Sequence, residues 1–393
     1  MNREDFNIFN YNNIVYFDNA ATTFKPDCVV NKICEYYYKY CSNSHRGDYD
    51  ISFKVDDEID NTREVVHKFI NSKMKDEIIF TKNTTDSLNQ IVFGFFYNYL
   101  DDNDEVILSS NEHASNILPW LILSKFKNIK IRFIKSDKLS LNDIKNNISN
   151  KTKVISIAHV TNVYGEVRDI ESIIKFAHKK NILVVIDGAQ SVPHMNIDVQ
   201  FLDIDFLAFS AHKMCGPTGV GILNGIYELL KKLKPLLYGG GMNKDFNSNK
   251  LELLDNPYRF EAGTINIADV IGFSEAIKYL NNIGIKKIEN YIIDLRRYFV
   301  KRLKEISYIK IYNEDYFGNT IVINMDGVMS GDLGLYLNSM KICVRSGKHC
   351  AKMINNNDDS VRISLYFYNT YDEVDYFISV LKEKDKIIKF VNN

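Results

Sequence analysis

The sequence predicts an α/β protein built on a large, mostly parallel sheet with helices on both sides. Short apolar runs alternate with helical patterns between about residues 75 and 225, which is typical of repeated strand–helix units. Two of these runs, LVVI at 183–186 and FLAF at 206–209, are apolar at every position. Such runs favour strands that are buried on both faces. Because both runs end in polar residues, we expect a ligand site at the carboxyl ends of these strands.

The composition is that of an ordinary globular protein. The 393 residues are 45% hydrophobic and 25% charged, and the formal net charge of −1 provides no basic field for nucleic acid. No apolar segment approaches the roughly 20 residues needed to cross a bilayer, and the first residues, MNREDFNIFNYNN, lack the apolar core of a signal peptide. Six cysteines without a CxxC pair indicate reduced thiols, not a disulfide framework or a zinc site. We therefore expect a cytoplasmic protein without a bound metal, a membrane or a nucleic-acid partner.

The two buried runs bring an acid and a lysine to the same predicted edge of the sheet. Asp187 ends the first run before the breaker Gly188, and the second run continues through SAHK to Lys213. In isolation, an acid and a lysine at strand ends are most often a solvated ion pair. The same two groups also suit pyridoxal 5'-phosphate (PLP), whose aldehyde is held by a lysine and whose ring nitrogen is kept protonated by a carboxylate.

Several motifs extend this interpretation. They are DGAQ at 187–190, SAHKMCGPTGVGIL at 210–223, RFEAGT at 259–264 and VRSGKHCAK at 344–352. With them the chain resembles the PLP-dependent cysteine desulfurases of the class V aminotransferase family, in particular the SufS-like group, from about Tyr16 to the C-terminal region. The resemblance implies fold type I of the PLP-dependent transferases (aspartate aminotransferase-like). It also implies a large PLP-binding domain over 16–282 and a smaller α+β domain formed by 1–15 and 283–393.

The resemblance assigns further residues to the cofactor. Thr84 and Thr85 fall where a helix should begin, and the matching turn of the family binds the PLP phosphate, as a helix N-terminus can. An isolated threonine pair is more often only an N-cap. His113 takes the place of the imidazole that lies over the pyridine ring and can move protons. The resemblance adds Asn162, Gln190, Ser210 and His212 to the cofactor site.

One cofactor contact is implied to come from a neighbouring subunit. Thr264, in RFEAGT, matches the threonine that reaches the phosphate of the partner's PLP. The resemblance therefore implies a homodimer whose sites lie near the subunit interface.

Cys350 is the candidate nucleophile. Gly347 before it permits an exposed turn, and Lys348, His349 and Lys352 supply positive or potentially positive charge that favours a thiolate. The family carries its persulfide-forming cysteine at this place. We interpret the other five cysteines as small hydrophobes, with Cys28, Cys34 and Cys41 at helical spacing in one helix.

The resemblance also identifies residues that bind substrate. Arg362, in VRISLYFYNT, matches the arginine that grips the α-carboxylate, for which bidentate geometry suits arginine. Asn162 contacts the same carboxylate. His45, in the NSHRG loop near the substrate entrance, is a minor candidate.

The predicted reaction is conversion of L-cysteine to L-alanine, with the sulfur captured as a persulfide on Cys350. An acceptor protein, SufE- or SufU-like, would then take the sulfur for iron–sulfur cluster assembly or another thiolation. Two enzyme alternatives remain open: a selenocysteine lyase or cysteine sulfinate desulfinase, and a PLP-dependent C–S lyase dedicated to a specialised pathway, which would not need Cys350. A scaffold that retains PLP only structurally is disfavoured, because a scaffold has no use for the carboxylate-binding Arg362.

The sequence departs from the family pattern at four places. Lys348 replaces the first of two histidines, Cys215 stands where relatives usually have tyrosine, and Ser330-Gly331-Asp332 lacks a histidine motif. The segment between Cys350 and Arg362 is also shorter than in typical members. These departures lie on the thiol side or the partner-facing side of the expected site, away from the PLP residues.

Overall fold

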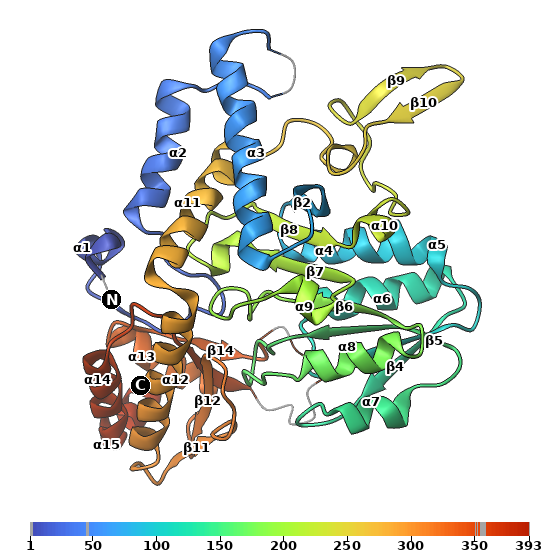
Figure 1. The fold of residues 1–393 in the computed structure, drawn as a ribbon. Helices are drawn as coiled ribbons and strands as arrows, with labels where there is room; N and C mark the ends of the chain where they lie inside the picture. The colour runs from blue at the N-terminus through green and yellow to red at the C-terminus, as the bar shows by residue number, and fades with distance from the viewer. Residues whose placement is uncertain (1–2, 45–46, 350, 352, 354–358, 393) are drawn as a thin grey trace.

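A seven-stranded sheet forms the centre of the molecule (Figure 1), a computed structural model that describes all residues except 1–2, 45–46, 350, 352, 354–358 and 393. Its strands follow the order β2-β8-β7-β6-β5-β3-β4. They are β2 (Ile78–Thr81), β3 (Glu105–Ser109), β4 (Lys130–Ile134), β5 (Thr152–Ala158), β6 (Leu183–Asp187), β7 (Phe206–Ser210) and β8 (Gly221–Gly225). Strands β7, β6, β5, β3 and β4 pair in parallel, and β8 runs antiparallel to both of its neighbours. The predicted mostly parallel sheet is confirmed.

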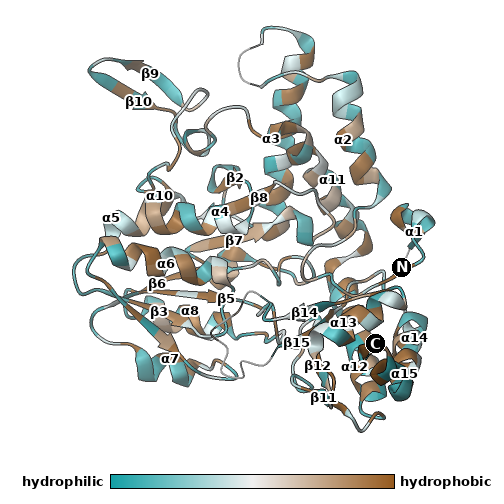
Figure 2. Cartoon of the chain, turned by 180° about the vertical axis from the view of Figure 1, so that it is seen from behind, coloured by the Kyte–Doolittle hydropathy of each residue, from teal (hydrophilic) through white to brown (hydrophobic). Residues whose placement is uncertain are grey.

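The strands are apolar throughout because both faces of the sheet are covered. In β6, Val184 and Ile186 belong to one hydrophobic core, whereas Val185 belongs to the other. Strand β7 alternates in the same way, with Leu207 on one side and Phe206 on the other. Successive side chains of a strand point to opposite faces, so a continuous apolar run buries residues in two separate cores. In Figure 2 these strands are coloured mainly as hydrophobic, whereas the outer helices carry both characters.

Helices cover each face. One face is covered by α4 (Thr84–Asn89) with the π-helical turn and α5 (Tyr97–Tyr99) that continue it, and by α6 (Ala114–Phe126) and α10 (Tyr227–Leu230). The other face carries α2 (Asp27–Lys39), α3 (Asp50–Ile70), α7 (Leu141–Asn147), α8 (Ile170–His178), α9 (Val199–Leu202) and α11 (Ile267–Ile283). In the described part of the chain, none of the helices is both long enough and apolar enough to span a bilayer.

The C-terminal part forms its own small sheet next to the central one. The order β11-β12-β15-β14 joins β11 (Ile309–Ile311), β12 (Thr320–Met325), β14 (Arg345–Gly347) and β15 (Ser360–Ser364). The helices here are α12 (Ile285–Leu303), α13 (Ser330–Ser339), α14 (Tyr371–Lys382) and α15 (Lys384–Val391). Helix α12 is amphipathic and buries apolar side chains such as Ile288 and Leu295. The Thr370 side chain caps α14 by accepting a hydrogen bond from the Glu373 N–H.

The N-terminal segment lies against this C-terminal part. The short strand β1 (Val15–Tyr16) pairs in parallel with β13 (Ile342–Cys343). Arg3 forms an ion pair with Glu373, and the rings of Phe6 and Tyr368 lie 4.9 Å apart between centroids. Just beyond Phe6 lies helix α1 (Ile8–Tyr11). The domain division at residue 282 stays a prediction, which these contacts are consistent with.

One local prediction is wrong, and one hairpin was not predicted. Cys41 lies beyond the end of α2 at Lys39 and is exposed, so it does not pack in that helix with Cys28 and Cys34. The hairpin follows the segment GGGMN at 239–243 and consists of β9 (Asn243–Asn247) and β10 (Lys250–Leu253). It projects from the body in Figure 1. The hairpin cannot be predicted from hydrophobic periodicity, because its strands are mostly polar and its faces are exposed.

Candidate active site

A cavity of about 310 Å³ opens at the carboxyl ends of the central parallel strands. Ala158, Asp187 and Ser210 end β5, β6 and β7, and all three line the cavity. Arg345 and Arg362, from β14 and β15, line it from the other side. The site therefore lies between the two sheets, at the edge where open α/β sheets bind ligands.

Most of the predicted site residues meet here. Those that line the cavity are Thr84, Thr85, His113, Asn162, Asp187, Gln190, Ser210, His212, Lys213 and Arg362. Thr264 does not line it and is exposed. His45 and Cys350 lie outside the described residues, so their predicted roles stay predictions.

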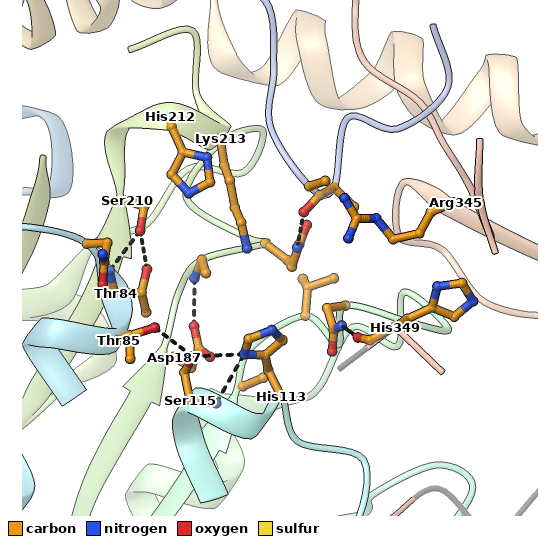
Figure 3. A pocket seen from close by; sticks show the side chains of 18 of the residues that line it. Thr84, Thr85, His113, Ser115, Asp187, Ser210, His212, Lys213, Arg345 and His349 are labelled. Atoms are coloured by element: carbon orange, nitrogen blue, oxygen red, sulfur yellow. Dashed lines mark hydrogen bonds between the residues drawn. The ribbon is translucent and has the colours of Figure 1, made fainter. Parts of the chain in front are cut away.

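Lys213 lies in a single 3-10 turn, Ala211–Lys213, directly after β7. Figure 3 shows its side chain extending into the cavity, toward the side on which Asp187 and His113 lie. The chain turns back tightly after it: a Cβ on Gly216 would lie 2.9 Å from the Ala211 carbonyl oxygen. Only glycine allows this close approach, which explains why the lysine is followed by the turn-forming Gly216-Pro217.

Asp187 is a buried carboxylate, with 5% of its surface exposed. Its Oδ1 accepts a hydrogen bond from the Ala189 N–H at 2.9 Å. Burial raises the pKa of Asp187, while the Ala189 N–H and the charge of Lys213 act in the opposite direction. A carboxylate so poor in partners is suited to receive a cationic donor from a ligand.

Hydroxyl groups form the wall beside Asp187. The Ser210 Oγ accepts the Thr84 N–H at 2.8 Å and lies 2.6 Å from the Thr84 Oγ1. The Thr85 Oγ1 lies 2.7 Å from the Ser115 Oγ. Helix α4 does begin at Thr84, but its N-cap is Asn83, whose Oδ1 accepts the Asp86 N–H at 3.0 Å. Because Asn83 caps the helix, the two threonine hydroxyls remain at the cavity wall (Figure 3).

His113 caps α6 with its own ring. Its Nδ1 accepts the Ser115 N–H at 3.1 Å, so in this arrangement the ring proton of the neutral imidazole is on Nε2. Burial lowers the pKa of His113 to about 4, with smaller contributions from the charges of Lys213 and Arg362. His113 is therefore an uncharged ring of fixed orientation at neutral pH.

The opposite wall is cationic. Arg362 donates from Nη1 to the Asn162 carbonyl at 2.9 Å and from Nη2 to the Asp18 Oδ1 at 3.1 Å. Arg345 donates to the same carboxylate, from Nη2 to Oδ2 at 3.0 Å. Asp18 thus holds both guanidinium groups at this wall. An anionic ligand group would be attracted to this wall.

Asn162 connects this wall to the C-terminal segment. Its Nδ2 donates to the His349 carbonyl at 2.8 Å. Its Oδ1 is buried and has no hydrogen-bond partner among the described residues. A buried acceptor without a partner is costly, which indicates that a ligand completes the site. Gln190 is held from the other side, where its Nε2 donates to the Ala20 carbonyl at 2.9 Å.

Several residues of the site were not predicted to bind a ligand. Arg345, His349 and Ser115 line the cavity, and Asp18 pairs with both arginines. Of these, His349 was expected to supply potentially positive charge beside Cys350. That expectation is wrong for the neutral pH range, because burial lowers the pKa of His349 to about 3 and leaves its ring uncharged.

Cys215 is the cysteine nearest in sequence to Lys213. It is fully buried, and burial raises the pKa of its thiol to about 12. A protonated, inaccessible thiol is a poor nucleophile.

Comparisons with known proteins agree with this geometry. The family model of aminotransferase class-V matches residues 15–377. A protein of Borreliella burgdorferi named "Probable cysteine desulfurase" is 41% identical over 98% of this chain and 96% of its own length. The apo structure of a cysteine desulfurase from Thermococcus onnurineus NA1 has a TM-score of 0.93 and 35% identity, covering 98% of this chain and 97% of that one. The cysteine desulfurase CsdA from Escherichia coli, solved with an S-sulfonic acid, has a TM-score of 0.91 and 29% identity, covering 98% and 97%.

Proposed function

The chain belongs to the aminotransferase class-V family, and from this premise we propose that it is a PLP-dependent cysteine desulfurase. The observation that carries the proposal is the meeting of Lys213, Asp187 and Arg362 in one cavity. A lysine for the aldehyde, a carboxylate for the ring nitrogen and an arginine for a carboxylate are what PLP and an amino acid require.

The cavity fits PLP. The hydroxyls of Thr84, Thr85 and Ser210 would be the hydrogen-bonding groups for the phosphate. Asp187 would pair with the ring nitrogen, His113 would lie over the ring and the unpartnered Oδ1 of Asn162 would face the bound ligands. Bound PLP supplies an electron-accepting ring that stabilises negative charge on the substrate.

Residues of the chain bind the substrate and transfer its protons. Arg362 binds the α-carboxylate of L-cysteine and so orients its Cα–H bond. The Lys213 Nζ would hold the PLP aldehyde at rest and, as a free amine during turnover, would remove the Cα proton and return a proton to the alanine product. His113 is neutral at pH 7 because burial lowers its pKa to about 4, and with its proton on Nε2 it can donate a hydrogen bond into the site.

We assign the sulfur-accepting thiol to Cys350. Its thiolate attacks the substrate sulfur, the Cβ–S bond breaks and a persulfide forms on the protein while alanine leaves. Support comes from Lys348 and Lys352, which lie on either side of Cys350 in the sequence, and from the high pKa of Cys215, about 12, which removes the main competitor.

The test is incubation of the holoenzyme with L-cysteine, with alanine, sulfide and protein-bound persulfide measured with and without a thiol reductant. Alanine and sulfur should form in equal amounts, and Cys350→Ala should lose the persulfide while Cys215→Ala retains it. The reverse pattern would overturn the assignment to Cys350. Full alanine production by Cys350→Ala would favour the C–S lyase, and a strong preference for selenocysteine or cysteine sulfinate would favour those alternatives.

The enzyme would act as a homodimer. Thr264 is exposed on this chain, where it could reach the phosphate of a partner's cofactor. The projecting hairpin β9–β10 exposes Phe246 (67%) and Leu251 (59%), and large exposed apolar side chains mark contact surfaces. Sedimentation of the holoenzyme should show a dimer, and a fully active monomer would contradict this.

The product sulfur would pass to a SufE- or SufU-like acceptor in the cytoplasm, for iron–sulfur cluster assembly or another thiolation. Support comes from the family, because the outer sulfur of a persulfide can be transferred to the thiol of another protein. Transfer of labelled sulfur to a candidate acceptor, with Cys350→Ala as the control, would test this step.

A further inference from the structure

The carbonyl oxygen of His212 accepts hydrogen bonds from a whole group of donors. The Thr23 N–H lies at 3.0 Å, the Thr22 Oγ1 at 3.0 Å and the Thr23 Oγ1 at 3.2 Å. The Lys25 Nζ adds a fourth contact at 3.4 Å. A carbonyl oxygen has two lone pairs, so this one is surrounded by more donors than it can fully use. This carbonyl belongs to the peptide that joins His212 to Lys213.

The same short segment also holds the chain after Lys213. The Thr23 Oγ1 accepts the Cys215 N–H at 2.8 Å. The Lys25 Nζ donates to the Thr22 Oγ1 at 3.1 Å and to the Thr23 carbonyl. Residues 22–25 therefore hold the backbone on both sides of Lys213, although they lie far from it in the sequence.

Lys25 is an ammonium group without a carboxylate partner among the described residues. All its hydrogen bonds go to neutral oxygen atoms, those of Thr22, Thr23 and His212. Burial lowers the pKa of Lys25 to about 8, and the neighbouring Cys215 thiol acts in the other direction. Hydrogen bonds from an ionised donor are stronger and more directional than neutral ones, so the ammonium tightens the group around the His212 carbonyl.

We propose that Thr22, Thr23 and Lys25 are positioning residues for Lys213. They fix the plane of the His212–Lys213 peptide and with it the direction in which the lysine side chain leaves the backbone. A lysine side chain has several rotatable bonds, and its nitrogen can be placed reproducibly only if the backbone that carries it is fixed. The inference rests on the proposed function, because it takes Lys213 as the lysine that holds the cofactor and moves the proton.

Matched variants can test this role. Thr22→Val removes the hydroxyl and keeps the shape, whereas Thr22→Ser keeps the hydroxyl. Lys25→Met removes the ammonium and keeps much of the stem. Thr62→Val is the control, since the Thr62 Oγ1 donates to the Glu58 carbonyl at 2.8 Å within α3, away from the cavity.

The first readout is the visible circular dichroism of the holoenzyme divided by its visible absorbance. This ratio reports how asymmetrically the cofactor is held, and it does not depend on turnover. We expect it to fall in Thr22→Val and Lys25→Met and to stay near the wild-type value in Thr22→Ser and Thr62→Val. The second readout is the kinetics with L-cysteine: kcat should fall on the order of tenfold with little change in KM, because positioning acts on the chemical step.

Two results would contradict the positioning role. Wild-type ratios and kcat in both Thr22→Val and Lys25→Met would overturn the inference, as would the same losses in Thr62→Val. If Thr22→Val does not fold, Lys25→Met against Lys25→Arg decides, with restoration expected in the arginine variant only. A wild-type protein that binds PLP without a visible band from a lysine linkage would overturn the proposed function itself.

Discussion

Replacing Asp187 by asparagine is expected to stabilise the cofactor-free protein while it disables the enzyme. Asp187 is buried, its carboxylate accepts a hydrogen bond from the Ala189 N–H, and burial raises its pKa. Asparagine has the same shape, and its Oδ1 can still accept the Ala189 N–H. The substitution therefore removes the cost of a buried charge, and with it the weaker attraction between that charge and Lys213.

The size of the effect follows from this burial. Relief of a poorly paired buried charge at a functional site is worth about 2 kcal/mol. With an unfolding entropy of about 2.1 cal/mol/K per residue, the melting temperature of the 393-residue chain should rise by roughly 2 °C. In the holoenzyme the loss of a charge-assisted hydrogen bond of about 1.5–3 kcal/mol should lower kcat by roughly 10- to 150-fold.

The stabilisation should depend on pH in a defined direction. Because the pKa of Asp187 is raised in the folded protein, the wild type loses stability as the pH rises from the unfolded value of about 3.9 through the folded value. Below about pH 4 the carboxyl is protonated in both states, so the variant should gain nothing there. The gain should grow as the pH rises toward and through the folded value.

Asp205→Asn provides a matched control with the opposite sign. Asp205 is equally buried, but its Oδ2 accepts the Val184 N–H at 2.7 Å and lies 2.9 Å from the His178 Nε2. Removing a well-partnered charge should destabilise the protein. Urea unfolding of the cofactor-free proteins at several pH values measures both variants. An Asp187→Asn protein less stable than wild type at pH 7 would refute the reasoning.

Three further predictions concern other parts of the chain. Lys213→Ala should bind PLP without the visible band of a lysine linkage and lose turnover, as absorption spectra and alanine assays would show; retention of both would place the linkage on another residue. Arg362→Gln should lower kcat/KM for L-cysteine by roughly thirtyfold or more, because a buried charged partner of the carboxylate is lost, and an unchanged value in steady-state assays would exclude the carboxylate role. His178 should stabilise the protein mainly at low pH: its hydrogen bond to Asp205 raises its pKa, so the contribution is complete below the unfolded value of about 6.5 and is lost as the pH rises through the folded value. His178→Phe should therefore cost more stability at pH 6 than at pH 9 in urea unfolding, and an equal cost at both would contradict this linkage.

Much of the fold was predictable because its signals are local. The runs at 183–186 and 206–209 are apolar at every position since both faces of the strands are buried, and this property is visible without knowing the partners. Asp187 and Ser210 end those strands. The residues that interrupt strands after them, Gly188 and Gly216-Pro217, indicate in the sequence where the edge of the sheet lies. The start of α4 at Thr84 was equally local.

The hairpin that was not predicted and the wrong placement of Cys41 have a common cause, which is the lack of a local signal. The hairpin β9–β10 is mostly polar and exposed, so no burial pattern marks it. Cys41 continues the helical spacing of Cys28 and Cys34, but α2 ends at Lys39, and spacing alone does not show where a helix stops.

The sequence by itself determined the layers of the fold and the kinds of chemical group at the strand ends. Only the tertiary structure decided how those groups are partnered. Asp18 joins Arg362, and Thr22 and Lys25 reach the His212 carbonyl, across most of the chain in one case and nearly half of it in the other. Strand and helix patterns arise from neighbouring residues, whereas hydrogen bonds between distant side chains depend on how whole elements pack, and no local pattern records that choice.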